Sequence, residues 1–304
     1  MIDYNVLSVG QCFQYACHSY IPKIFYHIDC GKNNFNLDFM YISGGNPKTL
    51  GALVNHTFSE VDEMFQIKDL PDNEGVKIKR TFRLQEYYLT ERWQNLTCDK
   101  SISIEKYVAG KHFSCVTLTS NIFWLLMHGI SLETATDLSI DLINKLREVC
   151  NPERLIVCMP YFRYNQVEKI GGMEEYINIH EKYIEKILET NCADLILRQD
   201  LGVNDMLPII GKTGNESTKD KFHLYKGILF YVMNYIYYKA VFETKTGLPA
   251  EELMLKQNII DKCNSTTLIN NTFNVDGFAI TREAMEKLFE ISENGKKYII
   301  NGKR

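Results

Sequence analysis

Residues 4–24 read YNVLSVGQCFQYACHSYIPKI and contain a strand, a turn and a helix in immediate succession. The first six of them are a mostly apolar run that Gly10 ends, which is typical of a buried β-strand. Apolar side chains then recur at helical spacing, at Phe13, Cys17, Tyr20 and Ile24. A buried strand that passes directly into a helix is the first unit expected of a parallel α/β sheet.

The same alternation continues along the chain. Further buried strands are predicted at residues 37–42, 114–119, 155–159 and 193–197. Helices are predicted at residues 132–150, where Ser131 is the expected N-cap, and at residues 173–188 and 224–242. Strands spaced by helices favour a doubly wound α/β fold, with a central parallel sheet covered on both faces.

Two segments depart from this alternation. Polar and apolar residues alternate over 76–89, which predicts a solvent-facing antiparallel β-hairpin within an insertion at about residues 55–105. After Pro249 the chain becomes rich in Asn, Lys and Glu, with one amphipathic helix near residues 282–291. We therefore expect a main domain at residues 1–249 and a helical C-terminal appendage at 250–304 that packs on it.

The composition is that of a globular chain of 304 residues, 45% hydrophobic and 24% charged. Its 34 basic and 38 acidic residues leave no global positive field, so neither nucleic acid nor an anionic membrane is an expected partner. The chain starts without a basic leader and has no long apolar run, which favours a cytoplasmic location. The oligomeric state is left open.

Nine cysteines are scattered along the sequence and show neither CxxC pairs nor the spacing of a zinc site. We interpret them as reduced thiols. The sequence predicts no metal ion and no other cofactor.

Ligands of doubly wound sheets bind at the carboxyl ends of the strands, so the turns that follow strands hold the candidate site. Four turns qualify, and together they supply a thiol, backbone amide donors, a side-chain amide and an Asp-x-x-His pair. They are Gly10-Gln11-Cys12, Ser43-Gly44-Gly45-Asn46, Thr119-Ser120-Asn121, and residues 219–224, which include Asp220 and His223.

These blocks resemble those of the SGNH (GDSL-like) hydrolases, and are closest to an uncharacterised bacterial branch whose first block usually reads G-N-S-F-S. Here that block reads Gly10-Gln11-Cys12-Phe13-Gln14, and Asp220-Lys221-Phe222-His223-Leu224 matches the D-G-x-H-L block. Tyr41-Ile42-Ser43-Gly44-Gly45 is similar to the Y-I-G-G turn, and residues 115–120 are similar to the third block. The resemblance covers about residues 4–249.

The resemblance implies a three-layer, flavodoxin-like α/β/α fold and acyl transfer to water. It implies Cys12 as the nucleophile, His223 as the general base and Asp220 as the group that orients the imidazole. Gly44 or Gly45 would supply an N–H to the oxyanion, and Thr119 and Asn121 are the candidates in the third block. Asn121 would match the side-chain amide of that block with a shift in register of one or two residues. The implied activity is that of an esterase acting on a small-molecule or glycan ester, which removes O-acyl groups such as acetyl from a carbohydrate.

Three positions depart from the family pattern. Cys12 replaces the usual serine, Gln11 replaces the usual asparagine, and Thr119-Ser120 replace a pair of glutamines. A thiolate is intrinsically a better nucleophile than a hydroxyl, so a cysteine variant is chemically reasonable, although losing one oxyanion donor slows such reactions by about 10²-fold. The alternative is a catalytically inactive SGNH-fold protein that binds carbohydrate or acts as a structural or interaction module.

Each candidate also has a purely structural interpretation. Cys12 fits a buried thiol at a tight turn, Asp220 fits a helix N-cap, and Gly44 and Gly45 fit ordinary turn positions. The other histidines have no partners at ligand spacing, and we predict structural or surface roles for them. They are His18, His27, His56, His112, His128 and His180.

Overall fold

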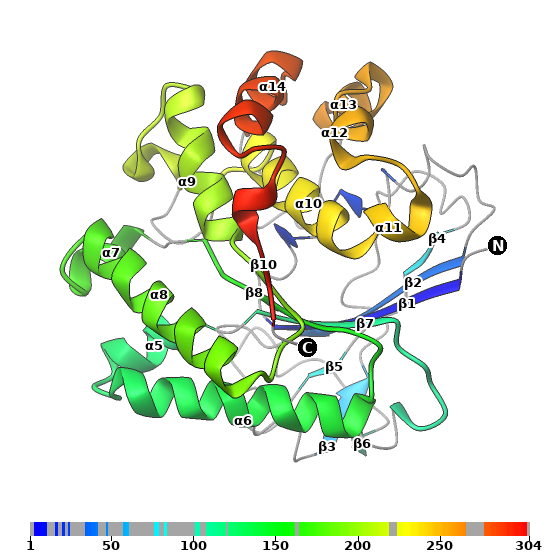
Figure 1. Cartoon of the computed structure of the whole chain (residues 1–304), viewed down its shortest axis with the longest axis vertical. Helices are drawn as coiled ribbons and strands as arrows, with labels where there is room; N and C mark the ends of the chain where they lie inside the picture. The colour runs from blue at the N-terminus through cyan, green and yellow to red at the C-terminus, as the bar shows by residue number, and fades with distance from the viewer. Residues whose placement is uncertain are drawn as a thin grey trace.

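Figure 1 shows the computed structural model of the chain. It describes residues 3–10, 16–17, 20–21, 24, 34–41, 47, 57–60, 76–78, 82–83, 101–103, 108–119, 121–161, 164–218, 224–265 and 277–302.

Five parallel strands form the centre of the sheet. They are β1 (Asp3–Gly10), β2 (Asn34–Tyr41), β7 (Cys115–Thr119), β8 (Leu155–Cys158) and β9 (Leu195–Leu197). Their spatial order is β9-β8-β7-β1-β2, so the second strand lies on one side of the first and the later strands lie on the other. This order is one that doubly wound sheets commonly adopt. The predicted parallel sheet is confirmed.

Helices cover both faces of this sheet (Figure 1). One layer contains α5 (Ile122–Met127), α6 (Leu132–Cys150), α7 (Tyr164–Lys169) and α8 (Met173–Thr190). The other contains α9 (Gln199–Ile209), α10 (Ile228–Val241), α11 (Glu243–Thr246), α12 (Ala250–Met254), α13 (Gln257–Asn264) and α14 (Arg282–Ile291). The predicted α/β class is therefore confirmed, and the arrangement is compatible with three layers.

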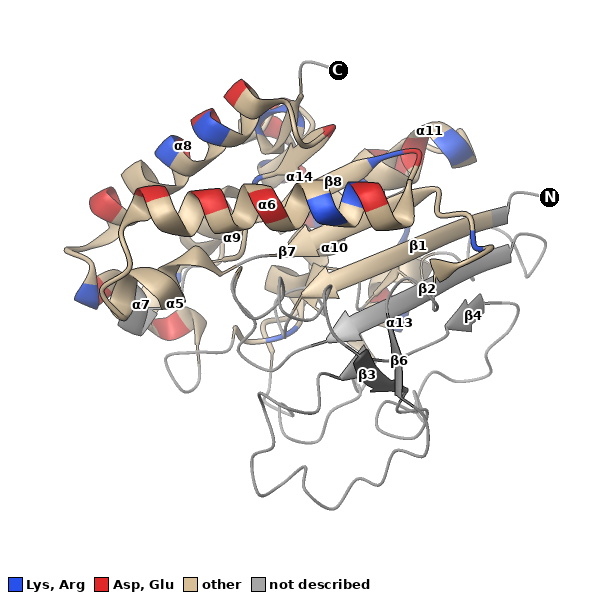
Figure 2. Ribbon diagram, turned by 90° about the horizontal axis from the view of Figure 1, so that it is seen from below, with Lys and Arg blue, Asp and Glu red and all other residues tan. Residues whose placement is uncertain are grey.

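The outer helices are amphipathic, as their sequence periods predict. In α6 the Ser131 side chain accepts a hydrogen bond from the Thr134 backbone N–H, which confirms the predicted N-cap. Asn151 ends the helix in the left-handed conformation. Figure 2 shows acidic and basic positions interspersed along α6 and α8, so these helices present charges of both signs.

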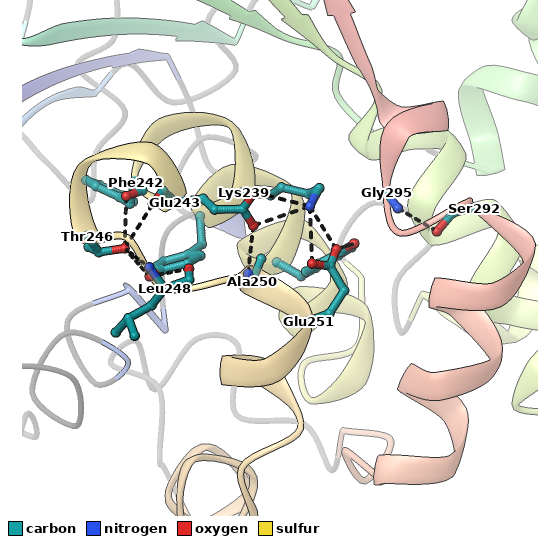
Figure 3. A network of polar contacts seen from close by, with 11 residues as sticks. Lys239, Phe242, Glu243, Thr246, Leu248, Ala250, Glu251, Ser292 and Gly295 are labelled. Atoms are coloured by element: carbon teal, nitrogen blue, oxygen red, sulfur yellow. Dashed lines mark hydrogen bonds and ion pairs between the residues drawn. The ribbon is translucent and has the colours of Figure 1, made fainter.

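Helix α10 is the central helix of its layer, and 13 of its residues are buried. Its polar atoms find partners in neighbouring elements; for example, the Tyr231 hydroxyl donates to the Met254 carbonyl at 2.9 Å. Figure 3 shows Lys239 between the carboxylates of Glu243 and Glu251, at 3.3 and 2.9 Å, and this network joins α10, α11 and α12. Glu243 also accepts from the Ala250 N–H at the start of α12, at 2.7 Å.

The start of α10 differs from the prediction. The helix begins at Ile228 rather than at residue 224, although the apolar pattern starts earlier. Leu224 instead forms an antiparallel bridge with Thr218, and Gly227 forms a bridge with Phe278 while adopting a φ of 76°. Contacts between segments distant in sequence therefore decide where this helix starts.

Two expectations about the outlying segments are corrected. Short strands do occur at β4 (Val76–Ile78) and β5 (Phe82–Arg83), but in the described residues both pair in parallel with β2 and not with each other. Strand β5 also pairs antiparallel with β3 (Thr57–Glu60), which in turn pairs with β6 (Ser101–Ser103). The described strands β4 and β5 therefore do not form the predicted hairpin with each other, and the rest of residues 76–89 lies outside the described residues. An alternating pattern indicates a strand without identifying its partner.

The C-terminal segment contains a strand as well as helices. Strand β10 (Ile299–Asn301) pairs antiparallel with β9 and extends the central sheet. Just before it, the Tyr298 hydroxyl and the Lys297 ammonium both donate to Asp205 of α9, at 2.8 and 2.7 Å. The segment is thus bound into the sheet and not only packed on its surface.

Gly227 offers a test of this packing. A Cβ at this position would collide with the backbone carbonyl of Phe278, and the φ of 76° already disfavours any other residue. We expect Gly227→Ala to lower the free energy of unfolding by about 3 kcal/mol or more, measured by urea denaturation. Gly247→Ala is the matched control, because Gly247 has a similar φ of 68° and open space around it, and should cost about 1–2 kcal/mol. Equal losses would contradict this account.

Candidate functional site

Two of the strands that precede the predicted site turns, β1 and β7, meet where the strand order reverses. Strands β1 and β7 are neighbours, with Val9 opposite Leu118, and they end at Gly10 and Thr119. The chain passes from β1 to β2 on one side and to β7 on the other, so this is the switch point at which doubly wound sheets bind ligands. The segments that follow both strands start from the same edge of the sheet.

The structure describes two of the predicted site residues, Thr119 and Asn121. Five others lie outside the described residues: Cys12, Gly44, Gly45, Asp220 and His223. Cys12 follows the end of β1 by two positions in the sequence, and His223 directly precedes the described Leu224.

Asn121 has the clearest environment. It precedes the first residue of α5 and is 1% exposed, but its side chain makes no capping hydrogen bond to that helix. Its Oδ1 atom is fully covered and has no hydrogen-bond partner in the part of the chain that the structure describes. A buried amide with an unpaired oxygen is costly, by about 1–3 kcal/mol, unless a ligand or water completes it. Thr119, at the end of β7, is also fully buried.

Asp220 and His223 lie outside the described residues, but the residues on either side of residues 219–223 are described. These flanking residues, Thr218 and Leu224, form an antiparallel bridge. The Leu224 N–H donates to the Tyr161 hydroxyl at 3.4 Å, and Tyr161 is a buried residue that closely follows the carboxyl end of β8. The two residues that flank residues 219–223 thus lie next to each other, and Leu224 contacts a residue that follows β8. Lys226 follows shortly after, and burial lowers the pKa of its ammonium to about 8.

The described cysteines are not candidates for a nucleophile. All six are buried, at Cys17, Cys115, Cys150, Cys158, Cys192 and Cys263. Burial raises the pKa of the Cys150 thiol to about 12, and it raises the pKa of Cys115 well above its ordinary value. Cys17, Cys115 and Cys158 are fully buried and belong to the core.

A second polar cluster occupies the carboxyl edge near β9. Arg198 directly follows β9 and pairs with Asp200, with Nη2 to Oδ2 at 2.9 Å and Nε to Oδ1 at 3.0 Å. His180 of α8 places Nδ1 3.0 Å from Asp200 Oδ2. Arg198 also donates to Glu181 at 2.5 Å, and Glu181 is the one half-exposed member. The sequence spacing did not reveal this cluster, because its members come from two different helices.

Burial alone would raise the pKa of Asp200. The hydrogen bonds and charges of His180 and Arg198 outweigh this effect, so the pKa of Asp200 lies below its ordinary value and the carboxyl group stays ionised. The Nε2 atom of His180 is buried and has no hydrogen-bond partner within the described residues.

Aromatic rings connect this cluster to the end of β7. Phe123 of α5 stacks on Tyr176 at 4.2 Å between ring centroids, and the His180 ring lies 4.9 Å from Phe123 and 4.5 Å from Tyr176. The Tyr176 hydroxyl donates to the Pro160 carbonyl, which follows β8, at 3.2 Å. The cluster therefore lies beside the turn that carries Asn121.

No family model matches the chain, and searches among curated proteins and among solved structures find no similar protein. In the described ranges no group of His, Cys, Asp and Glu side chains could hold a metal ion. Nor is any described helix both long and apolar enough to cross a membrane.

Proposed function

We propose that the chain is an SGNH-like acyl hydrolase with a flavodoxin-like three-layer fold, which removes O-acyl groups such as acetyl from a carbohydrate. Cys12 acts in place of the usual serine. The observation that carries this proposal is the common position of three segments that are far apart in the sequence. The described residues next to each candidate, namely Gly10, Asn121 and Leu224, lie at or beside the carboxyl ends of the neighbouring strands β1, β7 and β8.

The reaction divides into two acyl transfers. The Cys12 thiolate attacks the ester carbonyl, and the tetrahedral oxyanion collapses to a thioester while His223 gives its proton to the departing alcohol. His223 then takes a proton from water, which attacks the thioester and releases the carboxylic acid and the thiolate. Asp220 orients the imidazole throughout. The Asn121 amide N–H, with backbone amides at Gly44 or Gly45, donates to the oxyanion.

Release of p-nitrophenol from p-nitrophenyl acetate tests the proposal. We expect the wild-type chain to release it clearly faster than the same concentration of heat-denatured chain. Cys12→Ser is expected to retain measurable hydrolysis, because the serine would use the same base and the same oxyanion donors.

Equal rates for native and denatured wild type would contradict the esterase proposal and favour the alternative, a binding protein on the same fold. Activity that appears only in Cys12→Ser would show that the rest of the site is intact and that the native cysteine does not turn over.

A further inference from the structure

We propose that Asn301 is a site of spontaneous deamidation in the folded chain, whereas Asn294, which is also followed by a glycine, is protected by its surroundings. The sequence contains two Asn-Gly pairs, Asn294-Gly295 and Asn301-Gly302, and both asparagines are exposed. The reaction is independent of the proposed esterase activity. The two pairs differ in how firmly the fold holds the backbone nitrogen of the glycine.

Deamidation at such a pair is an intramolecular substitution. The backbone nitrogen of the glycine loses its proton and attacks the Cγ atom of the preceding asparagine, and the side-chain nitrogen leaves as ammonia. Water then opens the resulting succinimide ring, either to aspartate or to isoaspartate. Glycine favours the attack because it has no Cβ to restrict its backbone. A nitrogen whose N–H is held in a hydrogen bond must first be released, so the rate depends on how often that bond opens.

The backbone nitrogen of Gly295 is held by buried contacts. Its N–H donates to the Ser292 hydroxyl oxygen at 3.0 Å (Figure 3), and the same hydroxyl donates to the Leu288 carbonyl at 2.6 Å. Ser292 is fully buried, and a Cβ on Gly295 would collide with the hydroxyl of Tyr235, so the glycine packs closely on α10. Release of this nitrogen therefore requires the loss of contacts inside the fold.

The backbone nitrogen of Gly302 is held at the end of a short strand. Gly302 follows the last residue of β10, and its N–H donates to the Asp194 carbonyl at 2.8 Å. Its backbone also lies against the Ala193 carbonyl. However, Gly302 is half-exposed, and β10 has three residues and pairs only with β9 in the described part of the sheet. The last hydrogen bond of such a strand opens more often than a buried one.

The isoaspartate product would loosen the end of the sheet. It carries an additional methylene group in the main chain at residue 301, which moves the next residue along the strand. The Gly302 N–H would then no longer meet the Asp194 carbonyl in the present register.

The test compares the two pairs within one chain. The native wild-type chain is incubated in mildly alkaline buffer and digested, and the mass increase from amide to acid is followed by mass spectrometry in the peptides that contain Asn294 and Asn301. We expect Asn301 to convert at least about tenfold faster than Asn294, the ratio that one additional buried hydrogen bond provides. In concentrated urea the two rates should agree within about twofold, because the fold no longer distinguishes the two nitrogens.

Ser292→Ala tests the origin of the protection. This change removes the hydroxyl that holds the Gly295 N–H, so we expect the rate at Asn294 to rise about fivefold or more and the rate at Asn301 to stay unchanged. Ser265→Ala is the matched control, because Ser265 is likewise the C-cap of a helix and donates to the carbonyl of Lys262. It should change neither rate.

Equal rates at Asn294 and Asn301 in the native chain would overturn the proposal. The proposal would also fail if Asn301 stayed unmodified in the native chain for the time in which urea-treated chain is converted. An unchanged rate at Asn294 in Ser292→Ala would contradict the protection assigned to Ser292.

Discussion

Replacing Cys12 with alanine is expected to lower kcat/KM for p-nitrophenyl acetate at least about 10³-fold, to the background rate. The reason is that no other group can take its place in the covalent step, and loss of a nucleophile typically removes most of the acceleration that its base and donors provide. The measurement is the initial rate of p-nitrophenol release per folded molecule, with folding checked by circular dichroism.

Cys150→Ala is the matched control for this experiment. Cys150 is buried at the end of α6, and its thiol has a pKa raised to about 12, so it cannot supply a thiolate near neutral pH. Its replacement should leave the rate per folded molecule unchanged. A Cys12→Ala chain that hydrolyses the ester at the wild-type rate would rule out Cys12 as the nucleophile.

The second large effect is expected in stability. Asp200→Ala should lower the free energy of unfolding by about 3–5 kcal/mol, because it leaves the Arg198 guanidinium and the His180 imidazole buried without the carboxylate that binds both. Urea denaturation of wild type and variant measures the loss. Glu283→Ala removes an exposed ion pair with Lys287 and is the control, with an expected change below about 0.5 kcal/mol.

The same carboxylate gives a dependence on pH with a definite sign. Because its pKa is lower in the folded chain than the ordinary value of 3.8, Asp200 stabilises the fold above that value. This stabilisation is lost as the pH falls through the lowered folded pKa. The stability difference between wild type and Asp200→Ala should therefore be full at neutral pH and shrink in strong acid. A difference that is constant from pH 7 to about 2 would contradict the ionised state of Asp200.

Much of the fold could be predicted because its signals are local. The buried strand β7 and the amphipathic helix α6 each show a pattern within a few residues, and their observed bounds, Cys115–Thr119 and Leu132–Cys150, lie close to the predicted ones. Ser131 could be predicted as the N-cap of α6 because its contact with Thr134 is also local. The candidate site was predicted in the turns that follow strands, and five of its seven residues lie outside the described residues, so its position stays a prediction.

What could not be predicted depends on contacts between distant segments. Strand β10 has three residues, too few for a periodic pattern, and it exists because the edge of β9 was free to pair. The pairing of β4 and β5 with β2 could not be predicted either, because β2 lies far from them in the sequence. His180 was assigned no functional role from its spacing, because its partner Asp200 lies 20 residues away on another helix and only the folded chain brings the two together.

The most direct test of the account is to trap the acyl-enzyme. The wild-type chain is mixed with p-nitrophenyl acetate, quenched in acid during turnover, and digested for mass spectrometry. We predict one acetyl group on the peptide that contains Cys12, bound as a thioester that hydroxylamine removes, and an unmodified peptide in the Cys12→Ala chain. Turnover with no acetyl group on Cys12, or with acetylation of another residue such as Lys226, would contradict the proposed mechanism.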